Sequence, residues 1–267
     1  MTNKQANDMN LSIISSSIVT TLNQELSPEM AAKLTGGDKT AYVRTLFDKI
    51  SNRYDLIRTI VFLGHTSLWY RQSLSDVDLK VGDKVLDVGC GTGESTRYLM
   101  NRYPGINVEG MDISSGMLNE ARRLSPKVNY FEGDVSAIPC PNATYDFVLT
   151  TFTFRNFPER NVAIAEMLRV LRPGGRLLIL DHFYPQNPLW RAVYTFWMRR
   201  VVPQIVKPFI EDVTPYRYLA ESIINGLTIS GFKTLMELNK AAVLQTNTYT
   251  GGAAGRVIAV RQQEDIE

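Results

Sequence analysis

The fold is decided by the stretch Lys84-Val85-Leu86-Asp87-Val88-Gly89-Cys90-Gly91-Thr92-Gly93-Glu94. Its first half is a short apolar run, typical of an inner strand in a parallel sheet. The three glycines that follow allow the backbone to turn sharply and to lie close to a ligand. A helix is expected directly afterwards, with Thr92 or Gly93 as its cap. The stretch therefore predicts a strand, a glycine turn and a helix, with a ligand at the turn.

The residues of this turn distinguish between two kinds of ligand. A dinucleotide fingerprint needs glycine at the first, third and sixth positions, and the sixth position counted from Gly89 is Glu94. A carboxylate at the start of the helix would repel a pyrophosphate. Asp87, at the end of the strand, suits a cationic group, and S-adenosylmethionine carries an ammonium. The run D-x-G-x-G-x-G therefore favours the S-adenosylmethionine loop of class I methyltransferases over a turn without a ligand.

Composition sets bounds on the class of protein. The 267 residues are 44% hydrophobic, enough for one large α/β domain with or without a helical lid. The net charge of +2 gives no basic excess for nucleic acid. Two cysteines alone make neither a disulfide framework nor a metal site, and they indicate reduced thiols in a cytoplasmic protein. The stretch Leu11 to Leu22 is too short and too polar to span a bilayer, which leaves peripheral membrane contact open.

The alternation of apolar runs and helical segments after Lys84 predicts a doubly wound, Rossmann-like sheet of the α/β class. Seven strands are expected, and the last is expected to be antiparallel, as is usual in class I methyltransferases. The expected strands are 84–88, 107–111, 128–131, 145–150, 176–180, 231–238 and 255–260.

The domain organisation follows from what flanks this sheet. Residues 1–38 form a polar N-terminal extension, with a helix start at Ser27-Pro28 and a break at Gly36-Gly37-Asp38. Residues 39–267 form the methyltransferase domain, in which 39–80 is a helical cap and 183–213 an aromatic lid insertion. The extension has three open roles, as a tail, as a cover for the active site or as an arm in a homodimer.

Acidic residues follow the second and third strands at positions suited to a nucleoside. Asp112 lies 19 residues beyond Gly93, where a carboxylate accepts ribose hydroxyls, although a helix cap is an alternative role. Asp134 is placed to accept the adenine amino group, with Val135 against the ring. Tyr54 is expected to close over the methionine end. The predicted cofactor residues are Tyr54, Asp87, Gly89, Gly91, Asp112, Met117, Asp134, Val135 and Thr151.

The methyl acceptor is expected at the same carboxyl edge of the sheet. Arg155 lies in a Phe-rich stretch and needs a partner, either a structural carboxylate or a substrate oxygen. His182 follows the fifth strand and is a candidate general base, although it also suits a loop cap. The predicted catalytic residues are Arg155, His182 and Tyr216. The predicted acceptor pocket, for a large apolar molecule, consists of Trp69, Phe154, Asn156, Trp190, Tyr194, Trp197 and Tyr218.

These blocks resemble the UbiE/MenG family of ubiquinone and menaquinone biosynthesis C-methyltransferases. The resemblance covers residues 47 to about 260, and it implies S-adenosylmethionine as cofactor and a demethylquinol as acceptor. Its more specific blocks are the Tyr-Asp pair at 54–55, the Arg-Asn pair at 155–156 and the block at 216–223.

The chain also departs from the family pattern around the expected acceptor pocket. It has Ile57-Arg58 where the family usually has Met-Asn, and Asp181-His182-Phe183 where the family usually has Glu-Phe-Ser. Two alternatives therefore stay open. One is a methyltransferase of specialised metabolism acting on a prenyl diphosphate, with or without cyclisation, or on a prenylated natural product. Its diphosphate would bind Arg199, Arg200 or Lys207, although a lipid-headgroup contact is another role for that cluster. The other alternative is a non-catalytic cofactor-binding scaffold.

Overall fold

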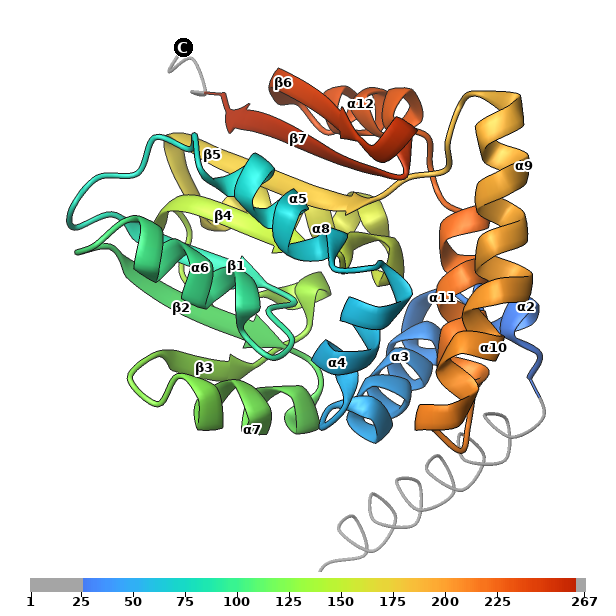
Figure 1. Cartoon of the computed structure of the whole chain (residues 1–267). Coiled ribbons are helices and arrows are strands. Elements are labelled where there is room, and N and C mark those ends of the chain that lie inside the picture. The colour runs from blue at the N-terminus through green and yellow to red at the C-terminus, as the bar shows by residue number, and fades with distance from the viewer. Residues whose placement is uncertain (1–25, 263–267) are drawn as a thin grey trace, which may run out of the picture.

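The computed structural model describes residues 26–262, which form one seven-stranded sheet with helices on both faces (Figure 1). The strand order is β3-β2-β1-β4-β5-β7-β6. Strands β1 to β5 are parallel, whereas β7 runs antiparallel to both of its neighbours. The strands are β1 (Lys84–Val88), β2 (Asn107–Asp112), β3 (Asn129–Glu132), β4 (Tyr145–Thr151), β5 (Leu171–His182), β6 (Ala241–Tyr249) and β7 (Ala254–Arg261). The doubly wound sheet with an antiparallel last strand is confirmed.

Two apolar layers hold the helices on the sheet. On one face, α5 (His65–Leu74) and α6 (Glu94–Arg102) pack on residues such as Val85 and Leu178. On the other face, α8 (Arg160–Val170) and α12 (Ile229–Leu238) pack on Leu86 and Ile179. The alternation of inward faces along β1 and β5 places consecutive apolar side chains in opposite layers. The order reverses between β1 and β4, and this reversal sets the ligand crevice at the carboxyl edge.

The expected sixth strand at 231–238 is wrong, because this segment is helix α12. Thr228 caps the helix by accepting a hydrogen bond from Gly231 N at 3.2 Å. Phe232 and Met236, four residues apart, are both buried against the sheet, which is the spacing of one helix face. Strand β6 begins only at Ala241, after Lys240 has taken a positive φ of 59°.

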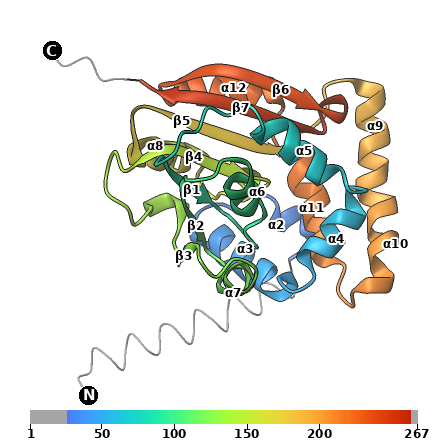
Figure 2. The ribbon, with the colours of Figure 1, turned by 60° about the vertical axis from the view of Figure 1, so that its left-hand side comes forward.

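A layer of helices covers the carboxyl edge of the parallel strands (Figures 1 and 2). It contains α2 (Pro28–Ala31), α3 (Gly36–Ile50), α4 (Tyr54–Val61), α9 (Pro188–Phe196), the π-helical turn η3 (Trp197–Val201), α10 (Val202–Val206) and α11 (Thr214–Ile224). The predicted cap (39–80) and lid (183–213) segments are both helical, and α4 of the cap packs on α10 of the lid, whereas α5 of the cap packs on a face of the sheet.

The N-terminal side of this layer differs from expectation at one point. Residues Gly36 to Asp38 do not break the chain, because α3 begins at Gly36. The preceding Thr35 is extended, and its carbonyl accepts the Lys39 N–H, so the glycines lie inside the first turn. The predicted Ser27 cap is confirmed, since its Oγ accepts Met30 N at 3.3 Å. The stretch Leu11 to Leu22 lies outside the described residues. Within residues 26–262, no helix has the length and apolar character needed to cross a bilayer.

Candidate active site

Two connected cavities lie between the carboxyl edge of the sheet and the helical layer. The larger, here called the loop cavity, holds about 850 Å³ of space outside protein atoms, part of it open to solvent. The smaller, here called the aromatic chamber, holds about 470 Å³ on the same measure. Four residues line both cavities and form the wall between them, namely Phe47, Tyr54, Arg58 and Phe152.

The glycine turn after β1 forms the floor of the loop cavity. Gly89 and Gly91 have positive φ values of 70° and 54°. A Cβ on Gly89 would lie 2.4 Å from Thr153 Cγ2, so this glycine is needed for packing within the protein. A Cβ on Gly91 would meet no atom within 4 Å. Gly91 therefore presents its backbone to open space, as expected where a ligand lies on the loop.

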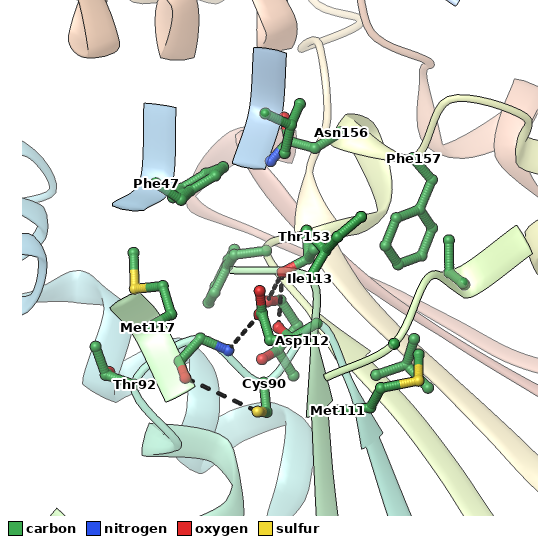
Figure 3. Close-up of a pocket in the computed structure, with 18 of the residues that line it drawn as sticks. Phe47, Cys90, Thr92, Met111, Asp112, Ile113, Met117, Thr153, Asn156 and Phe157 are labelled. Carbon is green, nitrogen blue, oxygen red and sulfur yellow. Dashed lines mark hydrogen bonds between the residues drawn. The ribbon is translucent and has the colours of Figure 1, made fainter. Parts of the chain in front are cut away.

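Asp112, at the end of β2, lines the loop cavity (Figure 3). It also links the glycine turn to α7 (Ser115–Leu124), the helix that follows β2. Its Oδ2 accepts Gly91 N at 2.8 Å, and its Oδ1 accepts Ser114 N at 2.9 Å. Burial raises the pKa of this carboxyl. The helix-cap alternative does not hold for Asp112, because Ser114 caps α7 through Met117 N. Asp112 is thus free to offer its remaining lone pairs to a ligand.

Eight of the nine predicted cofactor residues line the loop cavity, namely Tyr54, Gly89, Gly91, Asp112, Met117, Asp134, Val135 and Thr151. Asp87 does not line it. This carboxylate is fully buried below the turn, where it accepts hydrogen bonds from Ser95 Oγ at 2.6 Å and Thr96 Oγ1 at 2.7 Å. Burial raises the pKa of Asp87 to about 6. Its place in the structure is to fix the start of α6.

Arg58 is the main residue that the sequence reasoning missed. It lies at the junction of the two cavities and is 9% exposed. Its Nη2 forms ion pairs with Glu94 and, at 3.3 Å, with Asp55, whereas its buried Nε has no partner in the described chain. The spacing of Tyr54, Arg58 and Val61 places them on one face of an amphipathic helix, and this pattern in the sequence could have indicated that Arg58 faces the protein interior. Other lining residues not predicted are Phe47, Tyr70, Phe62 and Phe152.

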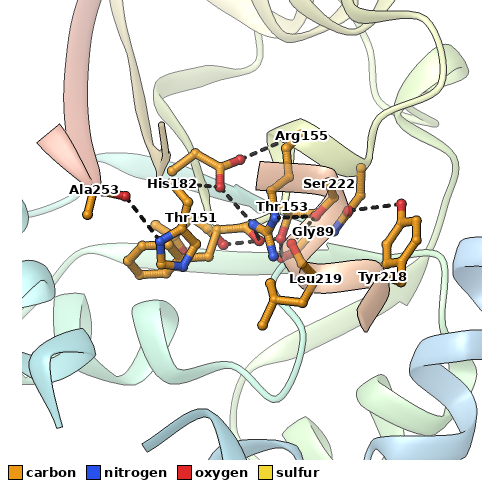
Figure 4. Close-up of polar contacts among 12 residues, drawn as sticks. Gly89, Thr151, Thr153, Arg155, His182, Tyr218, Leu219, Ser222 and Ala253 are labelled. Atoms are coloured by element: carbon orange, nitrogen blue, oxygen red, sulfur yellow. Dashed lines mark hydrogen bonds and ion pairs between the residues drawn. The ribbon is translucent and has the colours of Figure 1, made fainter. Parts of the chain in front are cut away.

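Arg155, which lines the aromatic chamber, has a structural carboxylate as its partner (Figure 4). Its Nη1 contacts Asp181 Oδ1 at 2.7 Å and also donates to Phe152 O, while its Nε donates to Ser222 Oγ at 3.3 Å. Burial lowers the pKa of the Arg155 guanidinium, but Asp181, Tyr54 and Tyr218 together outweigh burial, and the pKa is raised. The guanidinium therefore stays charged and holds β5, the turn after β4 and α11 together.

His182 lines the same chamber and is packed among aromatic rings. Its ring stacks on Phe62 at 4.3 Å between centroids, and the Phe152 ring lies 4.8 Å away. Burial, with a further effect of Arg155, lowers the pKa of His182 well below 6.5, so the imidazole is neutral. Nδ1 lies 3.4 Å from Ala253 O, and this contact requires the proton on Nδ1. Nε2 is then a hydrogen-bond acceptor.

Tyr216, from α11, is the third predicted catalytic residue in the aromatic chamber. Its side chain is 4% exposed, and its hydroxyl has no hydrogen-bond partner among residues 26–262. Burial raises the pKa of this phenol, so the hydroxyl keeps its proton. A buried hydroxyl without a partner costs free energy, which a bound ligand can recover by accepting its hydrogen bond.

Three residues of the predicted acceptor pocket, Trp190, Tyr194 and Trp197, line neither of the two cavities. Trp190 packs on the turn between β6 and β7, where its indole N–H donates to Thr250 O at 3.1 Å. Tyr194 is buried in the core layer below, and Trp197 packs against that layer. Their aromatic surface attaches the lid helices to the sheet.

Two further predicted pocket residues are also core residues. Trp69 lies behind His182, at 5.5 Å between ring centroids, and its indole N–H donates to Thr250 Oγ1. Phe154 points into the opposite layer, where its ring meets Phe232 at 4.8 Å. The two remaining predictions do line the cavities, since Asn156 borders the loop cavity and Tyr218 the aromatic chamber.

Residues 35–262 match the model of the ubiE/COQ5 methyltransferase family. A demethylmenaquinone methyltransferase of Paenarthrobacter aurescens is 38% identical over 68% of this chain and 71% of its own length. The ubiquinone/menaquinone biosynthesis C-methyltransferase UbiE of Saccharophagus degradans is 33% identical over 80% of this chain and 89% of its own. A demethylmenaquinone methyltransferase of Staphylococcus haemolyticus is 30% identical over 86% and 98%.

Solved structures show the same fold at lower sequence identity. A SAM-dependent methyltransferase from Aquifex aeolicus superposes with a TM-score of 0.56 at 21% identity, over 77% of this chain and 97% of that one. A methyltransferase in complex with the Trm112 activator of Haloferax volcanii gives a TM-score of 0.61 at 16% identity, over 81% and 98%.

Proposed function

Because the chain belongs to the ubiE/COQ5 methyltransferase family, and is thus an S-adenosylmethionine-dependent C-methyltransferase, we propose that it methylates a ring carbon of a prenylated demethylquinol. The names of its relatives support a quinol acceptor. The observation that carries the proposal is the shared wall between a loop cavity that carries carboxylates and an aromatic chamber that contains a neutral histidine.

The loop cavity suits the methyl donor because its groups match the donor's polar atoms. Asp112 is acceptor-only when ionised and would take the ribose hydroxyls, as Asp134 would take the adenine amino group. Glu94 would attract the ammonium, and Arg58 the carboxylate of the methionine end. The open space above Gly91 leaves room for the donor on the loop. When bound, S-adenosylmethionine supplies a methyl group on a sulfonium.

The aromatic chamber suits a planar, apolar ring. Its walls include Phe47, Phe62, Phe152 and Leu219, and these side chains exclude water from the reacting carbon. The shared wall of the two cavities would hold the ring beside the donor, and alignment of two reactants is a major part of methyl-transfer catalysis.

A quinol carbon becomes nucleophilic when an adjacent hydroxyl gains negative charge. His182 Nε2 would accept the hydroxyl hydrogen, and its neutral state keeps that lone pair available. Tyr216 would donate to the second ring oxygen, because its hydroxyl is protonated and has no partner of its own. Arg155 would be a positioning residue. Its contacts with Asp181 and Ser222 fix the turn after β4, which supplies Phe152 to the chamber wall.

The arrangement gives less support to the two alternatives. A prenyl diphosphate needs unpaired cations at the chamber, but Arg199, Arg200 and Lys207 line neither cavity, and the arginines that do line the chamber are paired with carboxylates. Arg199 is also paired with Glu221 at 2.7 Å. A scaffold without turnover would not need the buried His182 and Tyr216 beside the donor cavity.

The test is incubation of the full chain with methyl-labelled S-adenosylmethionine and a short-chain demethylmenaquinol, followed by mass spectrometry. We expect label on a ring carbon of the quinol, and Asp112→Ala serves as the loss-of-donor control. Label on an oxygen atom, or transfer to a prenyl diphosphate but not to the quinol, would contradict the proposal. Donor binding by calorimetry without transfer to any acceptor would favour the scaffold.

A further inference from the structure

Helix α9 has an exposed apolar stripe on the face turned away from the core. Leu189, Val193 and Phe196 are spaced four and three residues apart, and they are 77%, 49% and 64% exposed. The opposite face of the same helix carries the buried Tyr194. In Figures 1 and 2, α9 continues through η3 into α10 and forms the outer edge of the helical layer. The stripe therefore faces outward on an edge that no other described element covers.

A cationic surface adjoins this stripe. An open depression beside it is lined by Arg191, Arg199 and Arg200, together with the Tyr184 and Thr195 side chains. Arg199 is paired with Glu221 at 2.7 Å, whereas neither Arg191, which lies over the Tyr184 ring at 5.6 Å, nor Arg200 has an ion pair within the described part of the chain. The sequence from 183 to 210 contains four cations and no Asp or Glu, although the whole chain has a net charge of only +2.

We infer that this face of α9 docks onto an anionic phospholipid surface. An apolar stripe flanked by cations is the pattern of a helix that lies in the membrane interface. The side chains of Leu189, Val193 and Phe196 would enter the acyl boundary, and the arginines in the depression would bind lipid phosphates.

The charge of the depression also argues against two other occupants. In a twofold dimer through this face, each patch would meet its own copy, and the arginines would repel each other. Residues 1–25 contain two carboxylates, Asp8 and Glu25, and one cation, Lys4, so this segment carries a net side-chain charge of only −1. An anionic bilayer supplies negative charge over the whole patch.

The location of α9 fits delivery of a membrane-dissolved acceptor. Its continuation α10 packs on α4 and α11, the helices that supply Tyr54 and Tyr216 to the aromatic chamber. Docking would bring this helical layer to the bilayer in which a prenylated quinol resides. The docking surface itself goes beyond the proposed methyl transfer and does not depend on it.

The test is co-sedimentation of the full chain with phosphatidylcholine vesicles, with and without phosphatidylglycerol, over a range of salt concentration. We expect binding that needs phosphatidylglycerol and weakens with salt. Leu189→Ser/Phe196→Ser should lose at least about tenfold in affinity, and Arg191→Gln/Arg200→Gln about 30-fold. Leu238→Ser is the matched control, because Leu238 is 76% exposed on α12, away from the stripe.

Three results would overturn the inference. One is absence of binding to phosphatidylglycerol vesicles at low salt, and another is a stripe variant that binds as well as Leu238→Ser. The third is a dimer that the stripe variant dissociates, with no vesicle binding, which would assign the face to a second copy. Turnover of a short-chain, water-soluble quinol should be unchanged in every variant. Failure of docking is thereby distinguished from failure of the proposed methyl transfer.

Discussion

The loop cavity and the aromatic chamber share a wall but differ in the groups that they offer to a ligand. The loop cavity offers carboxylates and backbone atoms whose hydrogen-bonding capacity is only partly used, as at Asp112 and Gly91. The chamber offers rings, one neutral imidazole and tyrosine hydroxyls, while its two arginines, Arg58 and Arg155, are both paired with carboxylates of the protein. The first region thus supplies recognition energy, and the second supplies a dry, fixed space.

The largest effect should come from breaking the internal ion pair of the chamber. Asp181→Ala leaves Arg155 buried and unpaired, and it removes the acceptor of two backbone N–H groups, those of Arg155 and His182. We expect a loss of about 3–5 kcal/mol in the free energy of unfolding, measured by urea denaturation. Glu237→Ala, which removes an exposed pair with Lys233, should cost about 0.5 kcal/mol or less. Equal losses would show that the chamber is not organised by its ion pair.

The second prediction separates the chemistry of the chamber from its shape. His182→Phe keeps an aromatic ring against Phe62 but removes the Nε2 acceptor. We expect turnover to fall about 100-fold, with the dissociation constant of the donor unchanged. In the wild type, acid must protonate His182 to abolish this role, and its pKa is well below 6.5. Turnover should therefore stay level down through pH 6.5, and an acid limb centred there would contradict the neutral-histidine assignment.

The third prediction addresses the loop cavity alone. Asp112→Ala removes a charged acceptor of ribose hydroxyls, each such hydrogen bond being worth about 1.5–3 kcal/mol. We expect donor affinity, measured by calorimetry, to weaken about tenfold to 100-fold. Asp78→Ala removes an exposed carboxylate far from both cavities and is the matched control. An unchanged dissociation constant in Asp112→Ala would remove this residue from the donor site.

The two regions also differ in how far the sequence predicts them. The loop cavity follows from strand order, because Gly89, Asp112 and Asp134 lie at the carboxyl ends of three neighbouring parallel strands, and these ends meet at one edge of the sheet. Asp87 is the exception, since its side chain points below the turn to Ser95. That direction depends on the pleat of β1 and not on residue type.

The chamber was predicted only where a polar residue stood out, as with Arg155, His182 and Tyr216. Its walls come from α3, α4 and α11, which are distant in sequence and meet only through packing. The aromatic character of a residue does not distinguish a pocket wall from a packing contact. The predicted pocket therefore includes Trp190 and Phe154, which contact Thr250 and Phe232 instead of lining the chamber. The segment 231–238 was predicted as a strand for a similar reason, because a short apolar run fits both the helical period of 3.6 residues and the strand period of two.

The smallest expected effect concerns the unpartnered hydroxyl of the chamber. Tyr216→Phe leaves the buried ring in place and removes a donor that has no partner in the free protein. The free energy of unfolding should therefore be unchanged or slightly higher, since the cost of burying that hydroxyl is relieved. If a quinol oxygen is its partner, the KM of the acceptor should rise about fivefold, as expected for one neutral hydrogen bond of about 1 kcal/mol. Tyr194→Phe removes another buried, unpartnered hydroxyl outside both cavities and should leave KM unchanged. A matching rise in KM for both variants would mean that the chamber positions its acceptor by shape alone.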